Sequence, residues 1–131
     1  MYQFLDDVYN GLPISLFVLE RNENGDYVLI STNKTHDQEM GYKFEVMKGK
    51  TLFELVPDFF TQEEAEVLKE KIMLCLKERK DISYRKQINN NEICQIKTLS
   101  PVFKDNGEII RIIVSNMDIL KLNDLNHTIH G

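Results

Sequence analysis

The longest regular pattern in the chain lies between residues 61 and 80, where apolar side chains recur at helical spacing. Thr61 and Glu64 have the spacing of a capping box, which marks the start of a helix. The apolar positions share one face of such a helix, and they are Ala65, Leu68, Ile72, Cys75 and Leu76. The sequence therefore predicts one long helix that buries a single face.

Extended segments precede and follow this helix. Asn24-Gly25 and Asn106-Gly107 are strong signals for tight hairpins, and each lies between runs rich in apolar and β-branched residues. The predicted strands cover 14–20, 27–32, 81–88, 93–103 and 108–116, and shorter helical patterns cover 1–10, 33–40, 44–47 and 51–56. Two strands, a series of helices and three strands predict an α+β domain with a five-stranded antiparallel sheet and its helices on one face.

Composition and charge narrow the function. A chain of 131 residues suits one domain, and a net charge of -5 argues against nucleic acid as a partner. The longest unbroken apolar run, residues 72–76, is far shorter than the about 20 residues of a membrane span. The acidic start of the chain argues against a secretion signal, so we expect a cytoplasmic protein. Cys75 and Cys94 lack any metal-ligand spacing, which favours two reduced thiols and no metal site.

Several short motifs follow one another in a particular order. They are Asn33 with Gly41-Tyr42 eight residues later, the segment 51–57 (TLFELVP), the segment 100–108 (SPVFKDNGE) and Asp118-Ile119. In this order and spacing the chain resembles the PAS family over about residues 4–119. The resemblance implies the sheet order 2-1-5-4-3, with the long helix packed over the sheet. It also implies a sensory and dimerising module of a signalling protein, such as a sensor histidine kinase or a diguanylate cyclase, with a small ligand between sheet and helices.

The resemblance divides the chain into three parts. We expect an N-terminal flanking helix over 1–13, the PAS domain over 14–119, and a C-terminal linker or start of a signalling helix over 120–131. Leu122, Leu125 and Ile129 have the spacing of a single heptad, which fits either a helix that leads to an effector or a frayed terminus. The expected partners are a second copy of the chain, bound through the terminal helices, and an effector domain outside this sequence.

The same resemblance argues against two cofactors. Flavin-binding photoreceptors of this family need a cysteine in the stretch that corresponds to residues 49–54, which here reads GKTLFE. Oxygen-sensing haem members use a histidine on the long helix, and residues 61–80 contain none. We therefore predict neither flavin nor haem. Catalytic motifs are also missing from the sequence, so no enzyme is predicted. The alternatives are a stand-alone small-molecule-binding protein or enzyme on a similar frame, or a ligand-free interaction domain.

In the resembled family, the position of His36, three residues after Asn33, faces the pocket. His36 could form a polar pocket wall and sense pH, because histidine titrates near neutrality. It could also face solvent on a short helix, beside Glu39. The solvent-facing interpretation is preferred, because the phase of a short helix is uncertain by a residue or two.

The remaining pocket candidates follow from the family register and from strand alternation, although any α+β domain would also use most of them as core. Ser115, with Thr98 and Gln95, could supply polar atoms to a ligand. The candidate ligand-binding residues are Phe17, Leu19, His36, Glu39, Met40, Tyr42, Phe53, Leu68, Ile72, Ile96, Ile113 and Ser115. No residue is assigned a catalytic or metal-binding role.

Overall fold

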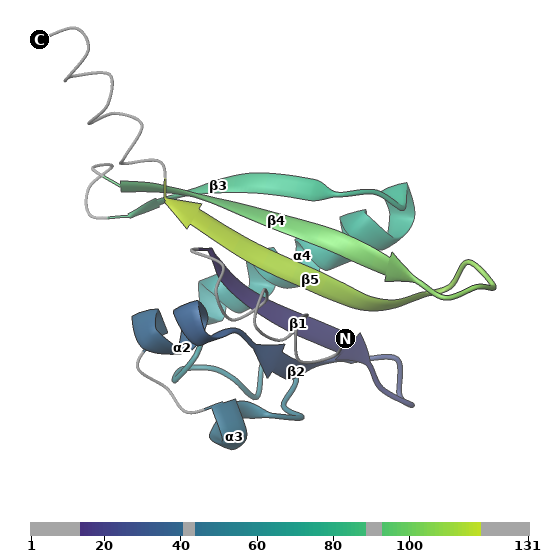
Figure 1. The fold of residues 1–131 in the computed structure, drawn as a ribbon, viewed down its shortest axis with the longest axis horizontal. Helices are drawn as coiled ribbons and strands as arrows, with labels where there is room; N and C mark the ends of the chain where they lie inside the picture. Colours follow the sequence, from purple (N-terminus) through teal and green to yellow (C-terminus); the bar gives the residue numbers. More distant parts are fainter. Residues whose placement is uncertain (1–13, 41–43, 89–92, 119–131) are drawn as a thin grey trace, which may run out of the picture.

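The computed structural model describes residues 14–40, 44–88 and 93–118. Its centre is a five-stranded antiparallel sheet of order β2-β1-β5-β4-β3 (Figure 1). The strands are β1 (Ser15–Arg21), β2 (Tyr27–Thr32), β3 (Ile82–Ile88), β4 (Ile93–Phe103) and β5 (Ile109–Asp118). The first and last strands lie side by side at the centre of the sheet, so the two hairpin-containing halves of the chain form one layer. This confirms the expected fold class and strand order.

Glycines form the turns of two hairpins. Gly25 has φ +86° between β1 and β2, and Gly107 has φ +87° between β4 and β5. Glycine adopts this left-handed conformation without the clash that a Cβ would cause. In the first turn the side chain of Asn22 accepts hydrogen bonds from the backbone amides of Asn24 and Asp26 at 3.0 and 2.9 Å. Both hairpins therefore form where the Asn-Gly pairs predicted them.

Three helices are described: α2 (Lys34–Met40), α3 (Phe44–Met47) and α4 (Gln62–Glu78). The capping box of α4 forms as expected. The Glu64 amide donates to the Thr61 hydroxyl at 3.1 Å, and the Thr61 amide donates to the Glu64 carboxylate at 3.0 Å. Arg79, with φ 57°, ends the helix. None of the described helices has the length and apolar character needed to cross a membrane.

The short turn of helix expected over 51–56 forms as hydrogen-bonded turns, with the Leu55 amide donating to the Thr51 carbonyl at 3.1 Å, and it does not extend into a regular helix. Its start is tied to β2: Thr51 forms an isolated bridge with Val28, and the Leu29 amide donates to the Lys50 carbonyl at 3.0 Å.

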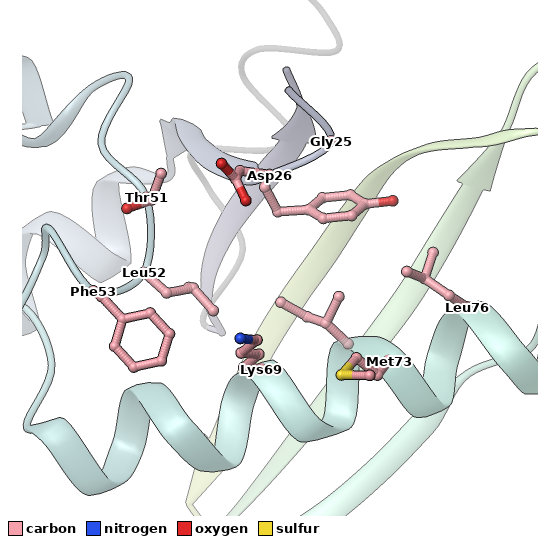
Figure 2. Close-up of a pocket in the computed structure, with 10 residues that line it drawn as sticks. Gly25, Asp26, Thr51, Leu52, Phe53, Lys69, Met73 and Leu76 are labelled. Carbon is pink, nitrogen blue, oxygen red and sulfur yellow. The ribbon is translucent and has the colours of Figure 1, made fainter. Parts of the chain in front are cut away.

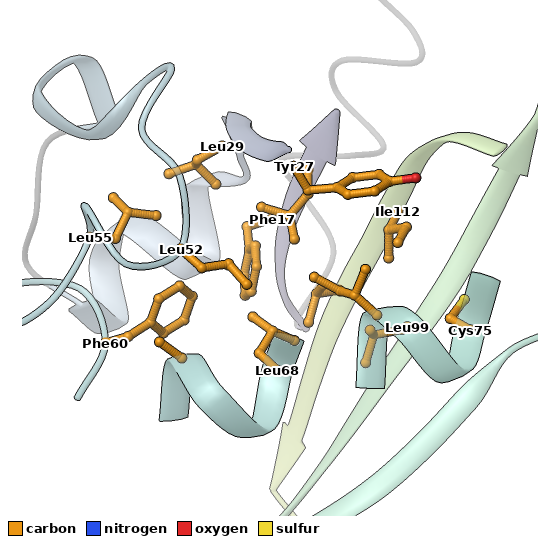
Figure 3. Close-up of a cluster of buried hydrophobic side chains, with 14 of the residues drawn as sticks. Phe17, Tyr27, Leu29, Leu52, Leu55, Phe60, Leu68, Cys75, Leu99 and Ile112 are labelled. Carbon is orange, nitrogen blue, oxygen red and sulfur yellow. The ribbon is translucent and has the colours of Figure 1, made fainter. Parts of the chain in front are cut away.

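The hydrophobic core fills the layer between α4 and one face of the sheet (Figure 3). The helix contributes Ala65, Leu68, Ile72 and Cys75, as its predicted apolar face requires. Across the sheet, the pairs Phe17–Val114 and Leu99–Val114 place three fully buried side chains in one row. The predicted helix over 1–10, the flanking segment 1–13 and the linker 120–131 lie outside the described residues.

Candidate functional site

A cavity of about 220 Å³ lies between the sheet and the first turn of α4. Its position follows from the strand register. Ser15 pairs with Asn116, Asn116 pairs with Lys97, and Lys97 pairs with Tyr84, so four polar residues form one row across the sheet. We call this the polar row. The cavity is lined by Ser15, Phe17, His36, Phe59, Phe60, Glu64, Lys86, Gln95, Lys97 and Asn116.

Aromatic rings form the apolar wall of this cavity. Phe17 contacts Phe59 and Phe60, with both pairs of ring centroids 5.8 Å apart. The His36 ring stacks on Phe59 at 5.1 Å and meets the edge of Phe17 at 5.6 Å. Each of these four side chains is buried. The cavity therefore has an aromatic side and, on the polar row, a side rich in hydrogen-bonding groups.

Asn33 fixes His36 in this position. Its side-chain oxygen accepts hydrogen bonds from the backbone amides of Leu16, at 3.0 Å, and of His36, at 2.9 Å. Its side-chain nitrogen donates to the Ile14 carbonyl at 2.8 Å. One fully buried asparagine thus caps the start of α2 and joins it to β1. The first turn of α2 is thereby held against the sheet, with His36 facing inward.

His36 is only 2% exposed, so the solvent-facing interpretation is wrong. Its Nδ1 has no hydrogen-bond partner among the described residues. The nearest carboxylate oxygen, Oδ1 of Asp37, lies 3.8 Å away and instead accepts from the Thr32 hydroxyl at 2.6 Å. Burial lowers the pKa of His36, and the Lys97 charge adds to this, while Asp37 acts in the opposite direction. His36 therefore presents a neutral imidazole to the cavity near neutral pH.

Lys97 is the most unusual member of the polar row. Its side chain is 7% exposed and forms no hydrogen bond or ion pair with any other residue in the described ranges. Burial, assisted by the Lys86 charge and opposed by Glu64, lowers the pKa of Lys97 to about 8. Beside it, the buried Oδ1 of Asn116 also has no partner within the described part of the chain. Buried polar groups are normally paired, so this side of the cavity can accept a ligand's polar atoms.

An open groove of about 440 Å³ adjoins the cavity and shares Glu64, Lys86 and Lys97 with it. Lys86 and Glu64 form an ion pair where the two spaces meet. Burial alone would raise the pKa of Glu64, but Lys86 and the Thr61 amide together lower it. Burial and the charge of Glu64 raise the pKa of Tyr84, which lines the groove, to about 12. The groove and the cavity therefore share one charged border.

A separate surface pocket of about 250 Å³ lies over the middle of α4 (Figure 2). Phe53, which was expected in the ligand pocket, lines this surface pocket and is 41% exposed. Lys69 lies over its ring, 5.6 Å from the centroid. Phe53 therefore lies at the surface, whereas Leu52 and Leu55 of the same segment are buried in the core.

The other sequence candidates separate into distinct environments. Phe17 and His36 line the cavity together, whereas Leu19, Leu68 and Ile72 are buried in the hydrophobic core. Ile96, Ile113 and Ser115, together with Thr98, project from the opposite face of the sheet, because successive strand residues alternate and Lys97, Ile112, Val114 and Asn116 occupy the helix-covered face. Placing those three residues in the pocket was therefore wrong. Tyr42 and the side chains of Glu39 and Met40 lie outside the described residues.

Sequence reasoning missed most of the polar row and its surroundings. Gln95, predicted as a source of polar atoms for a ligand, lines the cavity. Ser15, Lys97 and Asn116 line it as well, without having been predicted as ligand-binding residues. The signal for Lys97 was weak, because it lies between Ile96 and Thr98 and shares its strand face with the polar Gln95. Phe59 and Phe60, directly before the helix cap, could have been found as buried aromatics at the helix entry.

Comparison with solved structures identifies the fold. The sensory box sensor histidine kinase of Vibrio cholerae superposes with a TM-score of 0.66 at 20% identity, covering 89% of this chain and 90% of that one. A PAS domain from Colwellia psychrerythraea gives a TM-score of 0.64 at 16% identity, covering 92% and 98%. The PAS domain of BvgS from Bordetella pertussis gives 0.62 at 19% identity, covering 98% and 92%. No protein-family model and no curated protein matches the sequence.

Proposed function

Because the chain has the PAS fold, we propose that it is the sensory module of a signal-transduction protein and that it binds a small molecule in the cavity beside the polar row. One observation carries this proposal. Two buried polar atoms without described partners, Nδ1 of His36 and Oδ1 of Asn116, belong to residues that line the same 220 Å³ space. Leaving such atoms unpaired costs about 1–3 kcal/mol each. A ligand that pairs with them recovers that free energy on binding.

The rest of the proposal concerns signalling. A ligand that contacts both the sheet and α4 can shift the packing between them, and a flanking helix can pass such a shift to an effector. We propose a cytoplasmic homodimer joined through the terminal helices, with a histidine kinase or a diguanylate cyclase as effector, and with no catalysis of its own. The likeness to a sensor histidine kinase supports this choice at the level of the fold.

Native mass spectrometry of the chain purified from its host tests both parts. We expect a mass that exceeds the polypeptide by one small molecule, a dimer, and no absorption band in the visible region. Ser15→Leu, which places a larger side chain into the cavity, should remove the extra mass. Ser115→Leu, the same change on the opposite face of the sheet, should keep it. A visible absorption band from flavin or haem would overturn the cofactor part of the proposal.

A ligand-free interaction domain is the second candidate. It is favoured by the surface pocket over α4, where Phe53 and Met73 are 41% and 62% exposed. Apolar side chains clustered at a surface often mark a protein contact. In that case the wild-type mass would equal that of the polypeptide, and Ser15→Leu would change nothing in the spectrum.

A further inference from the structure

The charges around the cavity do not balance. Its lining residues include two cations, Lys86 and Lys97, and one carboxylate, Glu64. Lys86 and Glu64 form an ion pair with each other, and the buried His36 is neutral. Lys97 is 7% exposed and forms no ion pair within the described ranges, although the charge of Glu64 acts on it. A largely buried charge is destabilising unless it is paired, so this cavity favours an anion.

We propose that the ligand is a small organic acid with one carboxylate, a neighbouring hydroxyl and one aromatic or branched apolar group, and that Lys97 binds the carboxylate. This inference rests on the proposed function and names the class of ligand at the same site. The carboxylate, the hydroxyl and the apolar group each contact a different part of the cavity. The hydroxyl donates to Oδ1 of Asn116, and the apolar group contacts the rings of Phe17 and Phe59.

The size of the cavity limits the apolar group. An apolar protein cavity of about 150 Å³ takes up one benzene ring. The 220 Å³ cavity accordingly has room for one ring, or a branched chain of similar size, and for the few atoms of a hydroxy acid. Two carboxylates would leave a second negative charge without a partner, since Lys86 is already engaged by Glu64. A single carboxylate therefore fits better than a dicarboxylate or a phosphate.

The two adjoining spaces also orient the ligand. Lys97 lines both the open groove and the cavity, whereas Phe17, Phe59 and Phe60 line the cavity alone. A carboxylate on Lys97 thus lies at the junction of the two spaces, and the apolar group points inward to the rings. The Lys86–Glu64 ion pair is at this same junction.

Calorimetric titration of the full chain tests the inference. The probes are 3-phenyllactate, mandelate and 2-hydroxyisocaproate, each with its own primary amide, which has the same shape without the charge. We expect at least one acid to bind about tenfold or more tightly than its amide, because a hydrogen bond to a charged group is worth more than a neutral one. Lys97→Met should abolish that preference while changing amide affinity by less than about threefold.

Control variants distinguish binding at Lys97 from a general effect of removing a positive charge. Lys104→Met removes the same charge from an exposed position in the β4–β5 hairpin, and it should leave the acid preference intact. Lys97→Gln is a second variant that keeps a polar side chain, so that loss of preference does not depend on one substitution being tolerated.

Three results would overturn the inference: equal binding of acid and amide, a preference that persists in both Lys97 variants, or binding of none of the six compounds. The proposed function is judged independently, since a neutral or cationic molecule in the native mass spectrum would uphold ligand binding while excluding an acid.

Discussion

The two ends of the layer between α4 and the sheet are built differently. At the C-terminal end of the helix, which we call the packed end, Tyr27, Cys75, Leu99 and Ile112 are buried in the continuous core (Figure 3), and of these only Tyr27 also lines the surface pocket of Figure 2. Even the polar atoms there are paired: the Tyr27 hydroxyl donates to the Ile109 carbonyl at 3.2 Å, and the Cys75 thiol donates to the Lys80 carbonyl at 3.4 Å.

At the other end, which we call the cavity end and define by the residues that line the 220 Å³ cavity, this pairing is incomplete. Both buried side-chain atoms that lack a partner within the described ranges, on His36 and Asn116, are found here, together with Lys97, which is 7% exposed. Evolved cores rarely leave such groups unpaired, and exceptions occur where a structure serves binding rather than stability. This contrast is the reason why we propose the cavity end as the ligand site.

The largest expected effect tests the contrast directly. Ile112→Ala at the packed end removes a side chain with 0% exposure, so it should lower the free energy of unfolding by about 2–5 kcal/mol. Asn116→Ala at the cavity end removes an amide whose oxygen has no described partner, so it should cost less than about 1 kcal/mol. Urea denaturation of both variants measures the two costs. Equal costs would show that the two ends do not differ in this way.

The next effect concerns how the cavity end is held in place. Asn33→Ala removes a fully buried side chain whose hydrogen bonds, among them those with Leu16, Ile14 and His36, bind β1 to the start of α2. We expect a loss of about 2–4 kcal/mol, because the former partners stay buried without a replacement. Asn22→Ala is the matched control, since it removes two hydrogen bonds in an exposed turn and should cost about 1 kcal/mol or less. Thermal unfolding measures the loss of stability in both variants. Equal losses would contradict this expectation.

Lys97→Met should act in the opposite direction and stabilise the chain by about 1–3 kcal/mol at pH 7, because it removes an uncompensated buried charge. The pKa of Lys97 falls to about 8 in the fold, below its ordinary value of 10.5, so between these values the unfolded state binds more protons. Wild-type stability should consequently rise as the pH increases from 8 toward 9.5, and this rise should disappear in the variant.

Chemical denaturation at pH 7, 8, 9 and 9.5 measures both effects of Lys97→Met. Lys104→Met serves as the control, because its side chain is 51% exposed and its removal should change neither the stability nor the slope. A Lys97→Met protein that is less stable than the wild type at pH 7 would show that the ammonium is paired in the folded chain.

The fold was predictable from the sequence because its signals are local. The capping box at Thr61 and the two Asn-Gly hairpins determine where elements begin and turn, and each forms as expected. The family motifs then supplied the strand order. The turn of helix expected over 51–56 also forms, while the bridge from its first residue, Thr51, to the distant Val28 was not predicted.

The site was less predictable because it depends on which way side chains face. In β5, Ile109, Ile110, Ile112, Ile113 and Val114 are all apolar, so alternation could not distinguish the two faces, and Ile113 and Ser115 were placed on the wrong one. Whether His36 faces the cavity or solvent depends on the phase of a seven-residue helix. That phase is set by the buried Asn33 rather than by periodicity.

The smallest expected effect concerns the proton on His36. Burial lowers the pKa of His36 below its ordinary value near 6.5, and the charge of Lys97 lowers it further. The carboxylate of Asp37, 3.8 Å away, acts in the opposite direction. As the pH falls from 7 through 6.5, the unfolded state takes up a proton that the folded state does not, so stability should decrease, by about 1 kcal/mol or less by pH 6.

An NMR titration of the imidazole Cε1–H signal, assigned with His36→Gln, measures this pKa directly, and His36→Gln should also flatten the stability profile between pH 7 and 6. A measured pKa above 6.5 would mean that Asp37 outweighs burial. The cavity would then hold two positive charges, on His36 and Lys97, and a dianion would become the better complement to the cavity end.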